Sequence, residues 1–294
     1  MSHNTNVVVM SDGVEIPYRL DGNADPNAPL LVLSNPSLVD LSIWDETLSA
    51  FLANPQNQRY RLLRYDNRGR SKHNEKTPLN LEILTSDILT LLDTVKVKKA
   101  AAITGISLGG MAALNVALRY PERVATIMPC DFFPKSPLQN GTIWNARVEM
   151  ARRDKEAPVG SDGARLVGND LAEVMVKHWL SPKSWNGGLP ESKILALKKM
   201  AHDNRLDGLI SIVQAITSFD LLKGIEKATV PAMFVAGGDD KPVIESMKQL
   251  AANYGKGTEL RLIDDSGHIP AVDQPEELAH VLTDFLQANL SALE

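Results

Sequence analysis

Residues Gly105-Ile106-Ser107-Leu108-Gly109 match the Gly-x-Ser-x-Gly pattern of a nucleophile elbow. In this elbow a tight turn between a strand and a helix exposes the serine hydroxyl to a general base, and the flanking glycines prevent a Cβ clash. So short a pattern also fits a glycine-rich helix start. Here a strand candidate over residues 99–104 and a helix candidate over residues 111–120 flank it, in the order that the elbow requires. We therefore predict that Ser107 is a catalytic nucleophile.

A serine hydroxyl is a poor nucleophile at neutral pH and needs an imidazole base, itself oriented by a carboxylate. In hydrolases built on the elbow, the acid and then the histidine follow the serine, on loops after late strands. His268 follows the strand candidate over residues 259–263 through a Ser-Gly turn, and it is the predicted base. The predicted acid is Asp240, which lies three residues beyond Gly237 and so has room to turn out of its strand; its neighbour Asp239 is the alternative. Weaker acid candidates, expected to be solvated turn residues, are Asp264 and Asp265.

Acyl transfer also needs an oxyanion hole, in which backbone N–H groups meet the negative oxygen of the tetrahedral intermediate. Leu108, directly after the nucleophile, is expected to supply one of these groups. The second is expected from the turn after the strand candidate over residues 30–33, which reads Asn35-Pro36-Ser37-Leu38. Because proline has no N–H, Ser37 is the predicted donor and Leu38 is the alternative.

Eight short, largely apolar segments are candidates for the strands of one sheet. They span residues 7–10, 14–19, 30–33, 61–65, 99–104, 124–130, 230–236 and 259–263. Helix candidates separate most of them, and this alternation predicts an α/β protein with a mostly parallel eight-stranded sheet and helices on both faces. Between residues 131 and 229 the alternation stops, and a helical pattern interrupted by prolines takes its place. We predict that residues 131–229 are an inserted helical cap, on a core made of residues 1–130 and 230–294.

The composition of the 294-residue chain, with 44% hydrophobic and 23% charged residues, is typical of a globular protein. Its net charge is −5 and its basic residues are scattered, which argues against binding to nucleic acid or to an anionic membrane. The first residues lack a secretion signal and no apolar run is long enough to span a membrane, so we expect a cytoplasmic protein. No metal-ligand spacing, dinucleotide motif or phosphate loop is present in the sequence, so no metal or cofactor is expected.

With these residues assigned, the chain resembles the α/β-hydrolase superfamily over nearly its whole length, and more narrowly the 3-oxoadipate enol-lactonase group. The segments that carry the resemblance are residues 31–35, 40–45, 63–69, 105–111, 144–147, 215–220 and 266–268. An asparagine at the oxyanion turn, here Asn35, is typical of this group, whereas most other relatives have His-Gly. The resemblance implies an α/β-hydrolase fold and a serine hydrolase that opens an enol-lactone ring in aromatic catabolism, with Ser107, Asp240 and His268 as its triad.

The resemblance also indicates where the substrate binds. Asn35, Trp144 and Arg147 are the expected contacts. We expect Arg147 to pair with a substrate carboxylate; the alternative is a solvated helix charge. Three departures from the group's pattern lie near this site: a changed oxyanion turn at residues 36–38, a shortened loop at 68–71 and a longer cap around 157–168.

We therefore expect a hydrolase that cleaves a small-molecule ester or lactone, with a small carboxylated enol-lactone as its preferred substrate. A carboxylesterase or lactonase that acts on a larger, less polar compound is the alternative within this chemistry. A ligand receptor that has kept the fold and the triad without catalysing a reaction is the alternative outside it.

Overall fold

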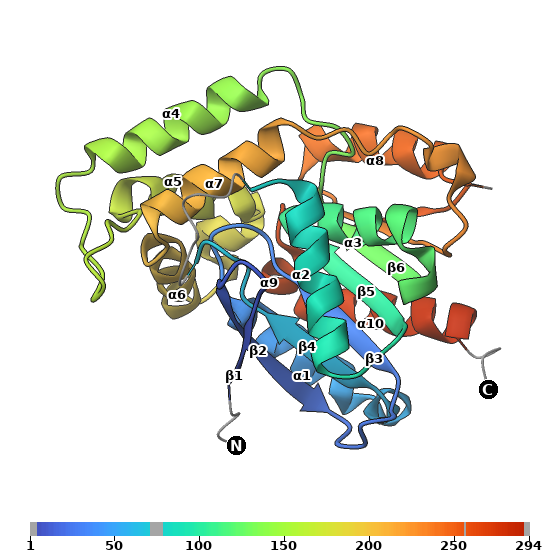
Figure 1. Cartoon of the computed structure of the whole chain (residues 1–294). Helices are drawn as coiled ribbons and strands as arrows, with labels where there is room; N and C mark the ends of the chain where they lie inside the picture. The colour runs from blue at the N-terminus through green and yellow to red at the C-terminus, as the bar shows by residue number, and fades with distance from the viewer. Residues whose placement is uncertain (1–4, 71–78, 256, 291–294) are drawn as a thin grey trace.

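The computed structural model describes residues 5–70, 79–255 and 257–290, which form an eight-stranded sheet flanked by helices (Figure 1). The strands are β1 (Asn6–Val9), β2 (Glu15–Gly22), β3 (Leu30–Ser34), β4 (Arg61–Tyr65), β5 (Ala100–Ile106), β6 (Val124–Cys130), β7 (Phe234–Gly237) and β8 (Leu260–Ile263). Their order across the sheet is β1-β2-β4-β3-β5-β6-β7-β8. β2 pairs antiparallel with β1 and β4, and every other neighbouring pair is parallel. The predicted mostly parallel sheet is confirmed.

Helices cover both faces of this sheet (Figure 1). On one face α1 (Asp45–Ala53) packs against α10 (Pro275–Leu290), and on the other α2 (Leu81–Thr94) packs against α3 (Leu108–Arg119). Every residue of β3 is consequently buried, which explains its continuous apolar run in the sequence. Outside the region between β6 and β7, the described residues also form α8 (Lys241–Asn253), the short α9 (Pro270–Asp273) and 3-10 helices at Leu41–Trp44, Pro55–Arg59 and Pro121–Arg123. No helix of the described residues has both the length and the apolar character needed to cross a bilayer.

The chain between β6 and β7 is helical, as predicted, and lies beyond one edge of the sheet (Figure 1). It contains α4 (Asn140–Arg153), α5 (Asn169–Trp179), a π-helical turn (Ser184–Gly188), α6 (Glu191–His202) and α7 (Leu206–Thr217). α4 packs against α7, and α5 packs against α6. We refer to this region as the cap; its limits as a domain, residues 131–229, stay a prediction.

Several elements differ by a few residues from their predicted bounds, and two of these differences have identifiable reasons. β7 begins at Phe234 rather than at residue 230, because Pro231 has no N–H to donate to the ladder and only its carbonyl pairs with β6. α3 begins at Leu108 rather than at residue 111, and so includes Gly109 and Gly110. Glycine has a low helix propensity, and tertiary contacts described below override it here.

In the segment after β4, residues 66–70, Arg68 forms ion pairs with two other parts of the chain. Arg68 Nε lies 2.7 Å from Asp87 Oδ2 on α2, and Arg68 Nη1 lies 2.6 Å from Asp12 Oδ2 in the first hairpin. The segment also meets the cap so closely that a Cβ on Gly208 of α7 would lie 1.7 Å from the carbonyl oxygen of Gly69. It is therefore a fixed part of the structure; Ser71, at the end of the predicted loop, lies outside the described residues.

Asp66, the first residue of this segment, makes the stability of the protein depend on pH. Burial raises the pKa of Asp66 to about 6, although the hydrogen bond from Leu41 and the charge of Arg70 act in the opposite direction. Because this pKa is above the unfolded value, ionisation disfavours the folded state, and stability falls as the pH rises from about 4 to 6. Asp66→Asn keeps an oxygen that can accept from Leu41 N–H but cannot ionise. The variant should gain about 1–2 kcal/mol relative to the wild type at pH 7, allowing for solvent screening, and no gain at pH 4.

Urea unfolding of both proteins at pH 4 and pH 7 measures this difference. Asp264→Asn, which removes an exposed carboxylate, is the matched control. An equal change in stability at the two pH values would contradict the prediction.

Candidate active site

Ser107 lies in the turn between β5 and α3. Its φ of 54° and ψ of −114° are outside the usual regions for a residue with a side chain. Its backbone N lies 2.9 Å from the carbonyl oxygen of Cys130 at the end of β6, so the turn is held against the neighbouring strand. A serine kept in a strained conformation by its surroundings is what a nucleophile elbow requires.

The two glycines of the motif occupy positions where a side chain has no room. A Cβ on Gly105 would lie 2.4 Å from the backbone of Gly109. A Cβ on Gly109 would lie 2.1 Å from the carbonyl oxygen of Ser34, at the end of β3. The start of α3 therefore packs against the end of β3, beside the turn at residues 35–38 from which the second oxyanion donor is expected.

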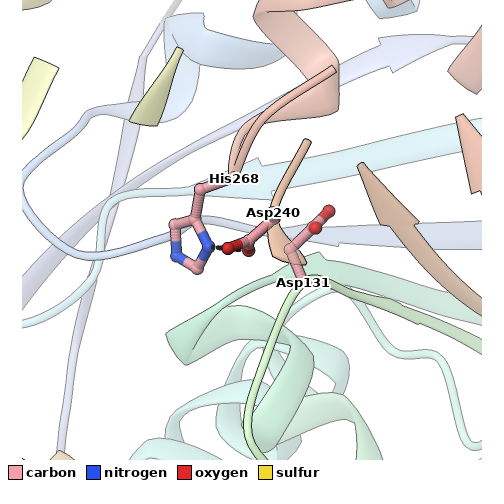
Figure 2. Close-up of side chains that lie close together, drawn as sticks. All are labelled: Asp131, Asp240 and His268. Atoms are coloured by element: carbon pink, nitrogen blue, oxygen red, sulfur yellow. Dashed lines mark hydrogen bonds and ion pairs between the residues drawn. The ribbon is translucent and has the colours of Figure 1, made fainter. Parts of the chain in front are cut away.

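The predicted base and acid meet at the same edge of the sheet. His268 follows β8 and Asp240 follows β7, and these strands are parallel neighbours. His268 Nδ1 lies 2.7 Å from Asp240 Oδ2, as Figure 2 shows. Asp240 is 8% exposed, whereas the alternative acid Asp239 is exposed, and the hydrogen-bond partner of His268 Nδ1 is Asp240. The structure thus brings His268 together with Asp240 rather than with Asp239.

The loop that carries His268 is bonded to the cap. His268 N lies 2.7 Å from the carbonyl oxygen of Trp179, the last residue of α5. One carboxylate oxygen of Asp273 accepts from Gly267 N at 2.7 Å and from Ser181 N at 3.1 Å, so it joins the base loop to the chain that follows α5. The approach is close, since a Cβ on Gly267 would lie 2.5 Å from the Trp179 carbonyl oxygen. The position of the base is therefore fixed from the cap side as well as by Asp240.

A cavity of about 350 Å³ lies between the sheet edge and the cap. The predicted residues on its wall are Ser37, Ser107, Leu108, Trp144, Arg147, Asp240 and His268. Its apolar wall consists of Leu108, Met111, Phe132, Phe133, Pro137, Ile143, Trp144, Ile216, Phe219, Pro242 and Val243. Within the described residues no hydrogen bond joins the Ser107 hydroxyl to the His268 ring; in unliganded enzymes this bond is often long and tightens when substrate binds.

Asn35 is not on the cavity wall, which corrects the expectation that it contacts substrate. Its side chain is fully buried and already bonded at both ends. Nδ2 donates to the Tyr65 carbonyl oxygen at 2.8 Å, and Oδ1 accepts from Trp44 Nε1 at 2.8 Å. Asn67, which sequence reasoning did not single out, donates in turn to the Asn35 carbonyl oxygen at 2.9 Å. Asn35 therefore fixes the turn at residues 35–38, from which the second oxyanion donor is expected. Ser37, rather than Asn35, lies on the cavity wall.

Trp144 and Arg147 face the cavity from α4, one helical turn apart. The Arg147 guanidinium lies 4.6 Å from the centre of the Trp144 indole ring, a cation–π contact. Burial lowers the pKa of Arg147 below its ordinary value, and no carboxylate of the described residues forms an ion pair with it. Arg147 is thus a positive charge on the cavity wall whose partner is a π face rather than an anion.

Two residues of the site were not predicted from the sequence. His178 of α5 lies on the cavity wall and stacks on His268, with ring centres 6.3 Å apart; burial and then the charges of His268 and Arg147 lower its pKa. Asp131, directly after β6, offers an oxygen that lies within 4.8 Å of both Asp240 and His268 (Figure 2). His178 belongs to no motif. Asp131, however, follows a strand that neighbours β7, and the strand-end rule that selected Asp240 also applies to it.

Asp131, Asp240 and His268 are also, among the described residues, the one group of acidic, histidine and cysteine side chains close enough to ligate a metal ion. Two of these side chains are already bonded to each other, through His268 Nδ1 and Asp240 Oδ2. The expectation that no metal is needed stays a prediction.

Comparison with known proteins identifies the family of the chain and several similar proteins. A model of the family described as "Alpha/beta hydrolase family" matches residues 40–281. Among curated relatives, 3-oxoadipate enol-lactonase 2 of Acinetobacter baylyi is 24% identical over 273 residues, which cover 92% of each chain. A putative carbamate hydrolase, RutD, of Stutzerimonas stutzeri is 25% identical, covering 92% of this chain and 96% of the relative. Among solved structures, the enol-lactonase from Burkholderia xenovorans LB400 superposes with a TM-score of 0.80 at 25% identity, covering 96% of this chain and 100% of the other.

Proposed function

The chain belongs to the alpha/beta hydrolase family and is a carboxylic ester hydrolase, and from this premise we propose that it cleaves its ester or lactone through an acyl-enzyme on Ser107. The proposal is supported above all by one observation: Ser107, in its strained turn, lines the same cavity as the bonded pair of His268 and Asp240. The family match also confirms the predicted α/β-hydrolase fold.

In the proposed mechanism each residue has one task. Asp240, as a carboxylate, accepts the Nδ1–H of His268, which leaves the lone pair on Nε2. Nε2 takes the proton of Ser107 as the hydroxyl attacks the acyl carbon, and the N–H groups of Leu108 and Ser37 bind the resulting oxyanion. His268 then returns the proton to the leaving oxygen, and a water molecule hydrolyses the acyl-enzyme by the same steps in reverse.

Within this chemistry we propose a small carboxylated enol-lactone as the preferred substrate. An enol oxygen leaves more readily than an alkoxide, because its charge is delocalised, so a triad without a metal is sufficient for this reaction. Arg147, which has no anionic partner among the described residues, is the group proposed to bind the substrate carboxylate. The enol-lactonases found among the relatives support this choice.

Arg147→Ala is expected to raise KM for a carboxylated enol-lactone by about 10- to 100-fold, because a charge-assisted hydrogen bond is lost. KM for the neutral methyl ester of the same lactone should change by less than about threefold, since it has no carboxylate to bind. Steady-state kinetics on the two substrates measure the difference, with Arg152→Ala, an exposed arginine of the same helix, as the matched control. Equal factors for both substrates would show that Arg147 does not bind the carboxylate.

The predominantly apolar wall favours a second candidate, a carboxylesterase or lactonase for a larger and less polar compound. A panel of carboxylated enol-lactones, neutral lactones and neutral aryl esters of increasing acyl length separates the two. We expect the highest kcat/KM on the carboxylated enol-lactones. A higher kcat/KM on neutral aryl esters would instead favour the second candidate.

A further inference from the structure

Asp131 is placed by the backbone at the centre of the active-site edge. It directly follows β6, it is 0% exposed, and its φ of 47° is in the left-handed region, which aspartate tolerates better than most residues. Its N lies 3.0 Å from the Val235 carbonyl oxygen of β7, and its Oδ1 accepts from Gly237 N at 2.8 Å. The side chain is therefore locked beside the strand that carries Asp240.

The second oxygen of Asp131 has no hydrogen-bond donor. Oδ2 is buried, and none of the described residues donates to it. One polar atom from each of the side chains of Asp131, Asp240 and His268 lies within 4.8 Å of the other two. Figure 2 shows Asp240 between the other two side chains, bonded to His268. An orphaned buried oxygen next to a carboxylate requires an explanation, because an ionised Asp131 would be unpaired and would also repel Asp240.

The charges around Asp131 indicate which of the two carboxyl groups keeps a proton. In the proposed mechanism Asp240 is the carboxylate that accepts the His268 Nδ1–H, so a proton shared by the two carboxyl groups belongs to Asp131. Burial first, and then the negative charge of Asp240, raise the pKa of Asp131 well above its ordinary value, while the Gly237 N–H lowers it; Asp273 adds a further negative charge. No lysine or arginine of the described chain forms an ion pair with Asp131 that would oppose this.

We propose that Asp131 is a neutral carboxylic acid whose Oδ2–H donates a hydrogen bond to the Asp240 carboxylate, so that Asp131 is a positioning residue for the acid of the triad. The expected effect of Asp131 on kcat rests on the proposed function, whereas its protonation does not. The proton removes the repulsion between the two groups, gives Oδ2 a partner, and leaves one negative charge beside His268 instead of two. Asp240 is then held from both sides, by His268 and by Asp131.

An asparagine at this position reproduces the proposed arrangement, because its oxygen accepts from Gly237 N–H and its amide N–H donates to Asp240. Leucine has a similar size and offers neither group. We expect Asp131→Leu to lower kcat by about 10- to 100-fold with little change in KM, the effect of removing a hydrogen bond to a charged group. Asp131→Asn should restore most of that loss.

The pH dependence distinguishes a neutral Asp131 from an ionised one. If Asp131 is neutral, Asp131→Asn leaves the charge near His268 as it was, and the acid limb of the kcat/KM profile should keep its midpoint to within about 0.3 pH unit. If Asp131 is ionised, the substitution removes a negative charge beside the base, and the midpoint should fall by roughly 1–3 pH units. Asp239→Asn, at the exposed neighbour of Asp240, is the control for a change of surface charge.

Infrared spectroscopy tests the proton without using activity. The difference spectrum of the wild type minus Asp131→Asn at neutral pH should contain the C=O stretching band of a protonated carboxylic acid, shifted in D₂O. Absence of this band, or a lowered acid limb, would overturn the inference even if the protein is an active hydrolase. Presence of the band in a protein without hydrolase activity would support the proton while refuting the proposed function. One equivalent of tightly bound metal that a chelator removes together with activity would also overturn the inference, since a cation would then lie between the carboxylates.

Discussion

Ser107→Ala is expected to lower kcat by about 10⁴-fold or more on any ester or lactone that the wild type hydrolyses. The variant keeps the oxyanion donors and the cavity but has no oxygen to form the acyl-enzyme. Its KM should change little, because a hydroxyl is replaced by hydrogen at the edge of the cavity. Steady-state kinetics at a raised enzyme concentration, with substrate still in excess, provide the measurement, and thermal unfolding shows whether the variant is folded.

Labelling with a fluorophosphonate probe tests directly whether Ser107 is the nucleophile. Wild-type protein should carry one adduct, which peptide mass spectrometry assigns to Ser107, and Ser107→Ala should carry none. Ser192→Ala, which changes an exposed serine of α6, should be labelled as the wild type is. Folded wild-type protein that remained unlabelled would favour the receptor alternative over the enzyme.

Asp240→Asn is expected to lower kcat by about 10³- to 10⁴-fold, as the loss of the orienting carboxylate does in other serine hydrolases. The asparagine amide can present its own N–H to His268 Nδ1, and the ring then carries its proton on Nε2, where the lone pair is needed. The negative charge that stabilises the imidazolium is lost as well. KM should be nearly unchanged, because Asp240 acts through His268.

The neighbouring residue offers a matched control for this change. Asp239→Asn removes the same charge one position away, from an exposed side chain that does not contact His268. Its kcat should remain within about threefold of the wild type, the scale of an exposed charge. The opposite order of effects would assign the orienting role to Asp239 and would contradict the site proposed here.

The sequence was sufficient to predict the sheet, and to select Ser107, Asp240 and His268, which line one cavity, because both predictions follow from strand ends. Parallel strands end at one edge of a sheet, so residues that directly follow them converge there. The choice between Asp239 and Asp240 needed coordinates, because two adjacent side chains diverge and a small rotation of the chain decides which one reaches the histidine.

The errors have physical causes as well. Asn35 was expected at the substrate because of its place in the oxyanion turn, but the bonding capacity of its amide is used by Tyr65 and Trp44, which only the packed structure reveals. Asp131 was counted as the start of the cap rather than as a strand end, and so its position beside Asp240 was missed. His178 reaches the cavity through the packing of α5 over the sheet edge, and no local sequence pattern specifies how a cap helix is rotated.

The bonds between the His268 loop and the end of α5 have a consequence for protein engineering. In this protein two main-chain groups of the cap bind the loop that carries His268. The Trp179 carbonyl oxygen accepts from His268 N–H, and the Ser181 N–H donates to Asp273, which also accepts from Gly267 N–H. A chimera that carries the cap of a relative keeps these bonds only if its backbone follows the same path at residues 179–181, because the cap supplies them through main-chain groups. The cap is therefore bonded to the His268 loop in its interior, just after α5, as well as joined to the sheet through β6 and β7.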